Sequence, residues 1–202
     1  MSFTPAALSQ FRFVPRAWRR ASALAVLIVC LQVVSAHAQL RAPDVRYDPS
    51  PVDVVQAMLK LADVKSGDVV YDLGCGDGRI VIAAVVQFGA RGVCVDIDPV
   101  RIAESRENAR KAGVEQRIRF VNEDLFTTGI GDASVVMLFL WPEVNLKLRP
   151  RLLGELAPGS RIVSHFHDMG DWKPQQSVRL RSEGYNRNVY LWTVPPQPDS
   201  GK

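Results

Sequence analysis

Cysteine and histidine are scarce, with three of each in 202 residues. So few cysteines exclude the disulfide-dense scaffold of a small secreted domain, and their spacing matches no structural zinc motif. His165 and His167 lie close to Asp168, but no third metal ligand is apparent, and catalytic zinc usually has three protein ligands. We therefore predict no metal site, and the alternatives are a metal at these histidines or a substrate-side role for His167.

Acidic residues are absent from the first 38 positions, and no apolar run there reaches the roughly 20 residues of a comfortable membrane span. Four arginines precede an apolar run over 21–34, and Ala36-His37-Ala38 then supplies small residues for cleavage before Gln39. This layout is typical of a secretory signal peptide. We predict that 1–38 is such a signal and that the protein is exported to the periplasm. The alternatives are an uncleaved membrane anchor over 21–35 and an organellar presequence.

A surplus of positive charge is also lacking outside this segment. Without the four arginines of the signal, 21 of the 25 basic residues remain to face 21 acidic ones. A neutral mature chain has no basic footprint for nucleic acid, so we predict no nucleic-acid partner. Contact with a membrane is expected only if the N-terminal segment stays attached.

The remainder of the chain is long enough for one domain and too short for two ordinary ones. Residues 39–51 carry three prolines and are predicted to form an extended arm. The domain is expected over 52–195, and a disordered tail over 196–202.

Apolar periodicity predicts an alternation of helices and strands. The helices are expected over 52–64, 79–88, 100–112 and 143–155, and the strands over 69–73, 93–96, 118–121, 133–140, 161–165, 177–181 and 188–193. This order predicts an α/β fold with a mostly parallel sheet covered by helices on both faces. The last two strands are separated by 183–186 and are expected to pair as an antiparallel hairpin.

The stretch Tyr71-Asp72-Leu73-Gly74-Cys75-Gly76-Asp77-Gly78 runs from a strand into a glycine-rich turn before an apolar helix. Glycines let the backbone turn sharply and approach a ligand closely. Their spacing is G-x-G-x-G, which differs from the dinucleotide fingerprint, and the two carboxylates would repel a pyrophosphate. A dehydrogenase is therefore excluded, and a cationic cofactor such as a sulfonium is favoured.

This turn resembles the first motif of the class I S-adenosylmethionine-dependent methyltransferases. Two further stretches follow the family's order: 92–98, whose strand ends in an acid placed for ribose hydroxyls, and 117–125, whose acidic turn would meet the adenine amino group. The resemblance implies a Rossmann-like seven-stranded fold and S-adenosyl-L-methionine as cofactor. The cofactor-binding residues that it implies are Asp72, Gly74, Cys75, Gly76, Asp77, Gly78, Asp96, Ile97, Asp124 and Leu125.

The first and second strands of this fold are neighbours, so a bridge between Cys75 and Cys94 is conceivable in an oxidising compartment. We expect two buried free thiols instead, because such a bridge would distort the cofactor turn.

The acceptor should lie beyond the end of the fourth strand, at Phe139-Leu140-Trp141-Pro142, because ligands of this fold bind at the carboxyl ends of the strands. Many amine- and amide-directed methyltransferases have an Asn or Asp followed by Pro-Pro and an aromatic residue here, and this segment lacks that polar first residue. We predict that the backbone carbonyls of Leu140 and Trp141 orient an amine and that Trp141 excludes solvent. Packing in the core is the alternative for Phe139 and Leu140.

More narrowly, the chain from Tyr47 to Trp172 is similar to the FAM173-type protein-lysine methyltransferases and their bacterial relatives. The resemblance implies that Tyr47 folds over the cofactor or the lysine channel and that Asp53 approaches the methionine end. The substrate-side candidates are thus Trp141, Pro142, Leu140 and Tyr47. The expected function is methyl transfer to a protein lysine. The alternatives are a small-molecule methyltransferase and a cofactor-binding partner module without catalysis.

Overall fold

The computed structural model describes residues 41–196, so the signal predicted over 1–38 and all but the first residue of the tail predicted over 196–202 lie outside the described residues. Within 41–196, no helix is long and apolar enough to cross a membrane. The helices are α2 (Val52–Leu61), α3 (Arg79–Phe88), α4 (Pro99–Lys111), the short η1 (Glu115–Arg117) and α5 (Pro142–Glu155). The strands are β1 (Val69–Leu73), β2 (Arg91–Asp96), β3 (Ile118–Asn122), β4 (Val135–Leu138), β5 (Arg161–His165), β6 (Gln176–Ser182) and β7 (Tyr185–Thr193).

Seven strands form one sheet in the order β3-β2-β1-β4-β5-β7-β6. The first five are parallel, and β7 pairs antiparallel with both β5 and β6. The predicted α/β fold with a C-terminal antiparallel hairpin is therefore confirmed. Because β1 and β4 are central neighbours, the turns that follow them meet at one edge of the sheet.

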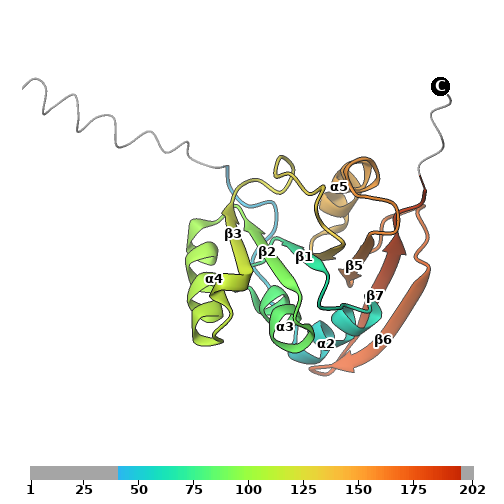
Figure 1. Ribbon diagram of the computed structural model, residues 1–202. Helices are drawn as coiled ribbons and strands as arrows, with labels where there is room; N and C mark the ends of the chain where they lie inside the picture. Colours follow the sequence, from blue (N-terminus) through green and yellow to red (C-terminus); the bar gives the residue numbers. More distant parts are fainter. Residues whose placement is uncertain (1–40, 197–202) are drawn as a thin grey trace, which may run out of the picture. The chain divides into compact units, whose positions relative to one another are not determined.

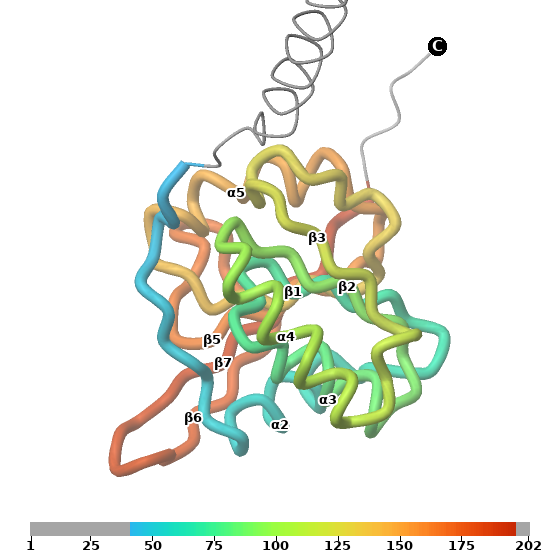
Figure 2. Tube along the Cα trace, turned by 90° about the vertical axis from the view of Figure 1, so that its left-hand side faces the viewer, coloured from blue at the N-terminus to red at the C-terminus, as the bar shows by residue number. Residues whose placement is uncertain are grey.

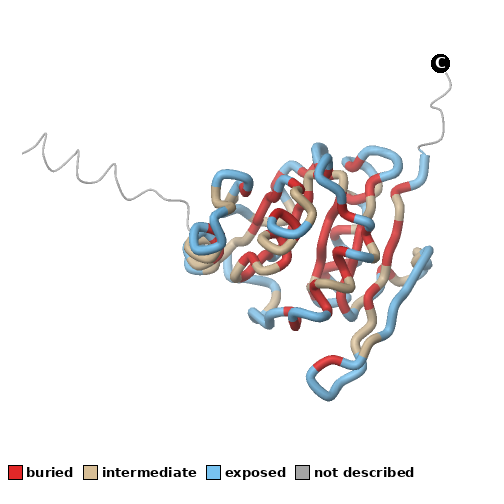
Figure 3. Tube along the Cα trace, turned by 60° about the horizontal axis from the view of Figure 1, so that its bottom comes forward, coloured by how far each residue is buried: buried red, intermediate tan, exposed pale blue. Residues whose placement is uncertain are grey.

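Helices cover both faces of the sheet (Figure 1). On one face α5 packs through Val144, Leu148 and Leu152 onto the strands, and on the other α2 and α3 contribute a second apolar cluster. Burial is concentrated in the central strands, whereas the edge strand β6 is largely exposed (Figure 3).

Some boundaries differ from the predicted ones. Strand β4 ends at Leu138, because Phe139 and Leu140 leave the ladder and line a pocket. The first helix ends at Leu61, and Asp63 then adopts a left-handed φ of 48°. The final strand begins earlier than predicted, because the hairpin turn consists of two residues, Glu183 and Gly184, with φ of 48° and 83°.

Candidate active site

The glycine turn between β1 and α3 forms the floor of the site. Gly74, Gly76 and Gly78 have φ of 83°, 54° and 78°, a region in which glycine is the residue without a steric penalty. The amides of Gly74 and Cys75 both donate to the carbonyl of Val95, at 2.8 and 3.0 Å. The turn is therefore fixed to the end of the neighbouring strand β2.

The space above this turn is enclosed by two side chains. A Cβ atom on Gly76 would lie 2.5 Å from Cε2 of Tyr47, and one on Gly74 would lie 3.0 Å from Cδ2 of Leu140. Gly78 packs against α4 instead, where a Cβ would meet the Cβ of Ser105 at 2.9 Å. The first two glycines let the side chains of Tyr47 and Leu140 pack directly against the turn, whereas Gly78 allows close packing of α4.

Asp96, at the end of β2, joins the turn to the start of α4. One carboxylate oxygen accepts from the amide of Gly76 at 2.9 Å, and the other accepts from the amide of Asp98 at 2.9 Å. A carboxylate has about four lone-pair sites, so capacity remains for hydroxyl donors. Burial is the main cause of a raised pKa at Asp96.

Two further carboxylates flank the turn and differ in environment. Asp72 is 2% exposed, and its Oδ2 has no hydrogen-bond partner. Burial, together with repulsion from Asp96 and Asp77, raises the pKa of Asp72 to about 8. Burial also disfavours the charge on Asp77, but the guanidinium of Arg79, at 2.7 Å, outweighs this effect and lowers its pKa. The buried Asp72 thus lacks a partner that a bound cation would supply.

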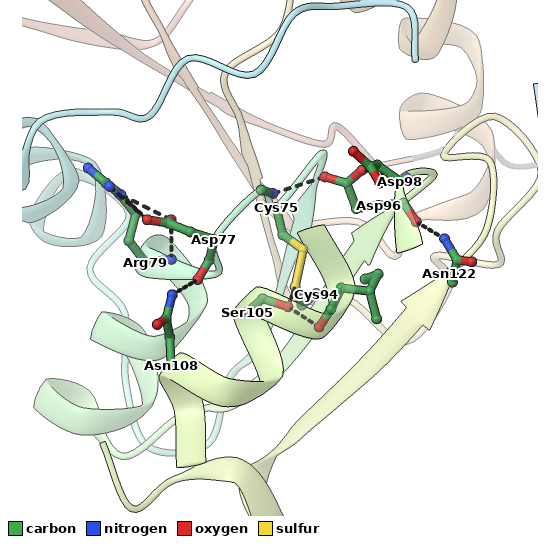
Figure 4. The surroundings of a disulfide bond; sticks show 11 residues. Cys75, Asp77, Arg79, Cys94, Asp96, Asp98, Ser105, Asn108 and Asn122 are labelled. Carbon is green, nitrogen blue, oxygen red and sulfur yellow. Dashed lines mark hydrogen bonds and ion pairs between the residues drawn. A yellow bond between two sulfur atoms is a disulfide. The ribbon is translucent and has the colours of Figure 1, made fainter. Parts of the chain in front are cut away.

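Cys75 and Cys94 form a disulfide, with Cα atoms 5.3 Å apart, so the prediction of two free thiols is wrong (Figure 4). The expected distortion of the turn does not occur. Cys75 starts the turn beside β2, where its amide already bonds to Val95, and the adjacent Gly76 retains its bond to Asp96. The disulfide therefore joins two segments that the backbone hydrogen bonds to Val95 already hold together.

The described part of the chain encloses a pocket of about 390 Å³ over the carboxyl ends of the strands. This volume lies within the usual range for small-molecule sites. Nine of the ten predicted cofactor residues line it, and Gly78 does not. These nine are Asp72, Gly74, Cys75, Gly76, Asp77, Asp96, Ile97, Asp124 and Leu125.

Of the predicted substrate-side residues, Tyr47 and Leu140 line the pocket, whereas Trp141 and Pro142 do not. Trp141 is 55% exposed and precedes α5, which Pro142 begins. The carbonyl of Trp141 accepts from the amides of Val144 and Asn145, at 3.0 and 3.1 Å. It thus serves the first turn of the helix, and its role toward an acceptor amine stays a prediction.

The N-terminal arm forms one wall of the pocket. Residues 41 and 43–50 line it, and the arm runs along the outside of the domain to α2 (Figure 2). The Arg41 guanidinium holds the Asp124 carboxylate with bonds of 2.6 and 3.0 Å, which lowers the pKa of Asp124. The contact of Asp124 with the adenine stays a prediction. In the structure the Asp124 carboxylate pairs with the Arg41 guanidinium.

Of the two arm-side residues expected near the cofactor, Tyr47 lines the pocket and Asp53 does not. The Tyr47 ring lies over Gly76 with the guanidinium of Arg101 4.6 Å from its centre. Asp53 accepts from the Ser182 hydroxyl at 2.6 Å and does not line the pocket, so its expected approach to the cofactor is not seen. Sequence reasoning missed Arg79 and Arg101, although Arg79 directly follows the glycine turn.

The two histidines of β5 and the following loop do not form a metal centre. His165 is buried, its Nδ1 lies 2.9 Å from the Ser50 hydroxyl, and burial lowers its pKa to about 4. Between the histidines, Phe166 has a φ of 70°, which breaks the strand. Within 41–196, no group of three metal-ligating side chains is present.

These features fit S-adenosyl-L-methionine. The unpartnered carboxylate of Asp72 suits the cationic end of that molecule, and the free lone pairs of Asp96 suit ribose hydroxyls. The site thus offers carboxylates where the cofactor has cations and hydroxyl donors.

Comparison with known proteins gives the same result. A family model described as the ANTKMT methyltransferase domain matches residues 72–176. A protein-lysine N-methyltransferase of Saccharolobus islandicus is 42% identical over 75% of this chain and 95% of its own length. The mouse adenine nucleotide translocase lysine N-methyltransferase is 34% identical over 69% of this chain and 59% of its own length.

Among solved structures, an RNA methyltransferase from Salinibacter ruber, in complex with S-adenosyl-L-homocysteine, is 48% identical. The match covers 76% of this chain and 98% of the Salinibacter ruber chain, with a TM-score of 0.72. The chain therefore belongs to the ANTKMT methyltransferase family, and it is an S-adenosylmethionine-dependent methyltransferase.

Proposed function

We propose that this enzyme transfers a methyl group from S-adenosyl-L-methionine to the side-chain amine of a protein lysine. The names of the relatives from Saccharolobus islandicus and mouse support this acceptor. One observation of the site carries the choice: the charge that surrounds the pocket.

Seven aspartates and four arginines line the pocket. The aspartates are Asp44, Asp48, Asp72, Asp77, Asp96, Asp98 and Asp124, and the arginines are Arg41, Arg46, Arg79 and Arg101. An excess of carboxylates attracts a cationic side chain such as lysine and repels a polyanion. RNA carries a phosphate at every nucleotide, and proteins that bind it neutralise these charges with Lys and Arg.

The acceptor amine has to be neutral, because an ammonium has no lone pair. Phe139 and the buried Leu140 line the pocket at the end of β4, and Tyr47 lies across the glycine turn. Apolar walls lower the pKa of a lysine by desolvation, and they exclude water that would compete for the methyl group. Bound S-adenosyl-L-methionine supplies the electrophilic methyl on its sulfonium.

RNA is the second candidate acceptor, because the similar protein from Salinibacter ruber is named as an RNA methyltransferase. Protein and RNA extracted separately from one bacterial lysate distinguish the two, with methyl-tritiated S-adenosyl-L-methionine as donor. We expect label in the protein fraction, with methyl-lysine in its acid hydrolysate. Label in nucleosides of the RNA fraction alone, or in neither fraction, would overturn a protein-lysine acceptor. The Asp96→Ala variant, which lacks the carboxylate beside Gly76, is the inactive control.

We also propose that the enzyme works outside the cytosol. Disulfides persist in oxidising compartments and are rare in the cytosol. The Cys75–Cys94 bridge supports this location, together with the signal-like composition of the first 38 residues.

A further inference from the structure

A strained turn follows β5 at the carboxyl end of the sheet. Phe166 adopts a φ of 70°, which is unusual for a bulky residue. The amide of His167 donates to the carbonyl of His165 at 2.9 Å, so the three residues form a γ-turn with Phe166 at its centre. A γ-turn with positive φ at its centre is rare and strained.

Neighbouring elements hold this turn in place. The amide of Phe166 donates to the carbonyl of Asn188 in β7 at 2.7 Å. From α5, the buried Asn145 amide donates to the Ser164 hydroxyl at 3.2 Å and to the carbonyls of His167 and Asp168 at 3.4 Å each. Strain that the surroundings enforce in this way is concentrated at functional sites.

The turn places an aromatic side chain at the surface, where its burial contributes little to stability. Phe166 remains 44% exposed. The buried His165 lies between this residue and the pocket: its ring centre is 6.2 Å from that of Phe166 and 4.0 Å from that of Phe139, which lines the pocket. Leu138 in β4 is in register with Ser164 in β5, so the two strands end side by side.

We propose that Phe166 is a specificity-determining residue that forms the outer wall of the acceptor entrance. The exposed ring of Phe166 and the pocket-lining ring of Phe139 both lie against the fully buried His165 ring, and these two phenylalanines offer apolar contacts for the methylene chain of an unbranched amine whose head reaches the carboxylates of the pocket. A side chain such as lysine fits both parts, because its stem is apolar and its head is cationic. This inference rests on the proposed lysine acceptor.

The test compares Phe166→Gly and Phe166→Tyr with the wild-type enzyme on the bacterial protein fraction. Glycine removes the ring and accepts the positive φ, whereas tyrosine keeps the ring. For Phe166→Gly we expect the apparent KM for protein lysine to rise at least fivefold, and the dissociation constant for S-adenosyl-L-methionine to stay within twofold. Phe166→Tyr should keep the wild-type KM. The matched control is Val86→Ala, since Val86 is an exposed apolar residue of α3 that does not line the pocket.

Each outcome bears on a different claim. A wild-type enzyme that yields no methyl-lysine overturns the proposed function and this inference with it. A wild-type enzyme that yields methyl-lysine, with an unchanged KM in Phe166→Gly, overturns only the role of Phe166. Equal losses of cofactor affinity and of activity would also overturn it, because they indicate a structural role. If Phe166→Gly does not fold, Phe166→Asn replaces it, since asparagine tolerates the left-handed region.

Discussion

Removal of the Cys75–Cys94 disulfide should lower the stability of the domain by about 3 kcal/mol. The two cysteines are 19 residues apart, and loop closure over this length in the unfolded chain corresponds to about 3 kcal/mol. For a domain of this size, each 1 kcal/mol shifts the Tm by about 2–4 °C, so the expected decrease is about 6–12 °C. The perturbation is the double variant Cys75→Ala/Cys94→Ala, measured by differential scanning calorimetry.

Two controls accompany this measurement. The wild-type domain, unfolded and refolded with dithiothreitol, should match the double variant, because it lacks the same bond. The double variant itself should not respond to dithiothreitol. A Tm difference below about 2 °C between oxidised wild type and the variant would refute the reasoning, since the turn would then be fixed by its backbone hydrogen bonds to Val95 alone.

Four further predictions concern the site and the N-terminus. Asp96→Asn should weaken cofactor binding in isothermal titration about 10- to 100-fold, because charged hydrogen bonds contribute about 1.5–3 kcal/mol each; an unchanged affinity would contradict the assigned role. Arg101→Ala should weaken it about two- to fivefold in the same titration through loss of the cation over Tyr47. Burial, with repulsion from neighbouring aspartates, raises the pKa of Asp72 to about 8. Between about pH 4 and pH 8 the folded state therefore binds one proton more than the unfolded state, and its stability decreases as the pH rises through this range. Urea unfolding of Asp72→Asn should lack this decrease of up to about 1.4 kcal/mol per pH unit. N-terminal sequencing of enzyme recovered outside the cytosol should begin at Gln39, whereas a start at Met1 would contradict cleavage.

Much of the fold and of the cofactor site follows from local sequence signals. Apolar runs and the glycine turn mark β1, β2 and the carboxylates at their ends, and these residues lie close together because parallel strands end at one edge. The disulfide could not be predicted in this way, since neighbouring strands allow both a bridge and two thiols. The bond between Arg41 and Asp124, two residues 83 positions apart, leaves no local signal either.

Trp141 illustrates a different limit. Its position after a central strand favoured a role at the acceptor, and the adjacent Phe139 and Leu140 do line the pocket. The direction of the side chain depends on where β4 ends and where α5 begins, and a shift of one or two residues changes it. Such boundaries are the least predictable part of a sequence pattern. Phe166 was not recognised because nothing in its sequence context indicates a positive φ.

The position of β7 determines the order in which the sheet can assemble on the ribosome. This strand is the last of those in the described residues, yet it lies between β5 and β6. Until Tyr185 has been synthesised, β6 has no partner, and β5 acquires a neighbour on its outer side only with Val189–Thr193. A nascent chain arrested before that point exposes an open sheet edge, which is a site for aggregation. The nascent enzyme therefore needs its C-terminal strand before its sheet can close.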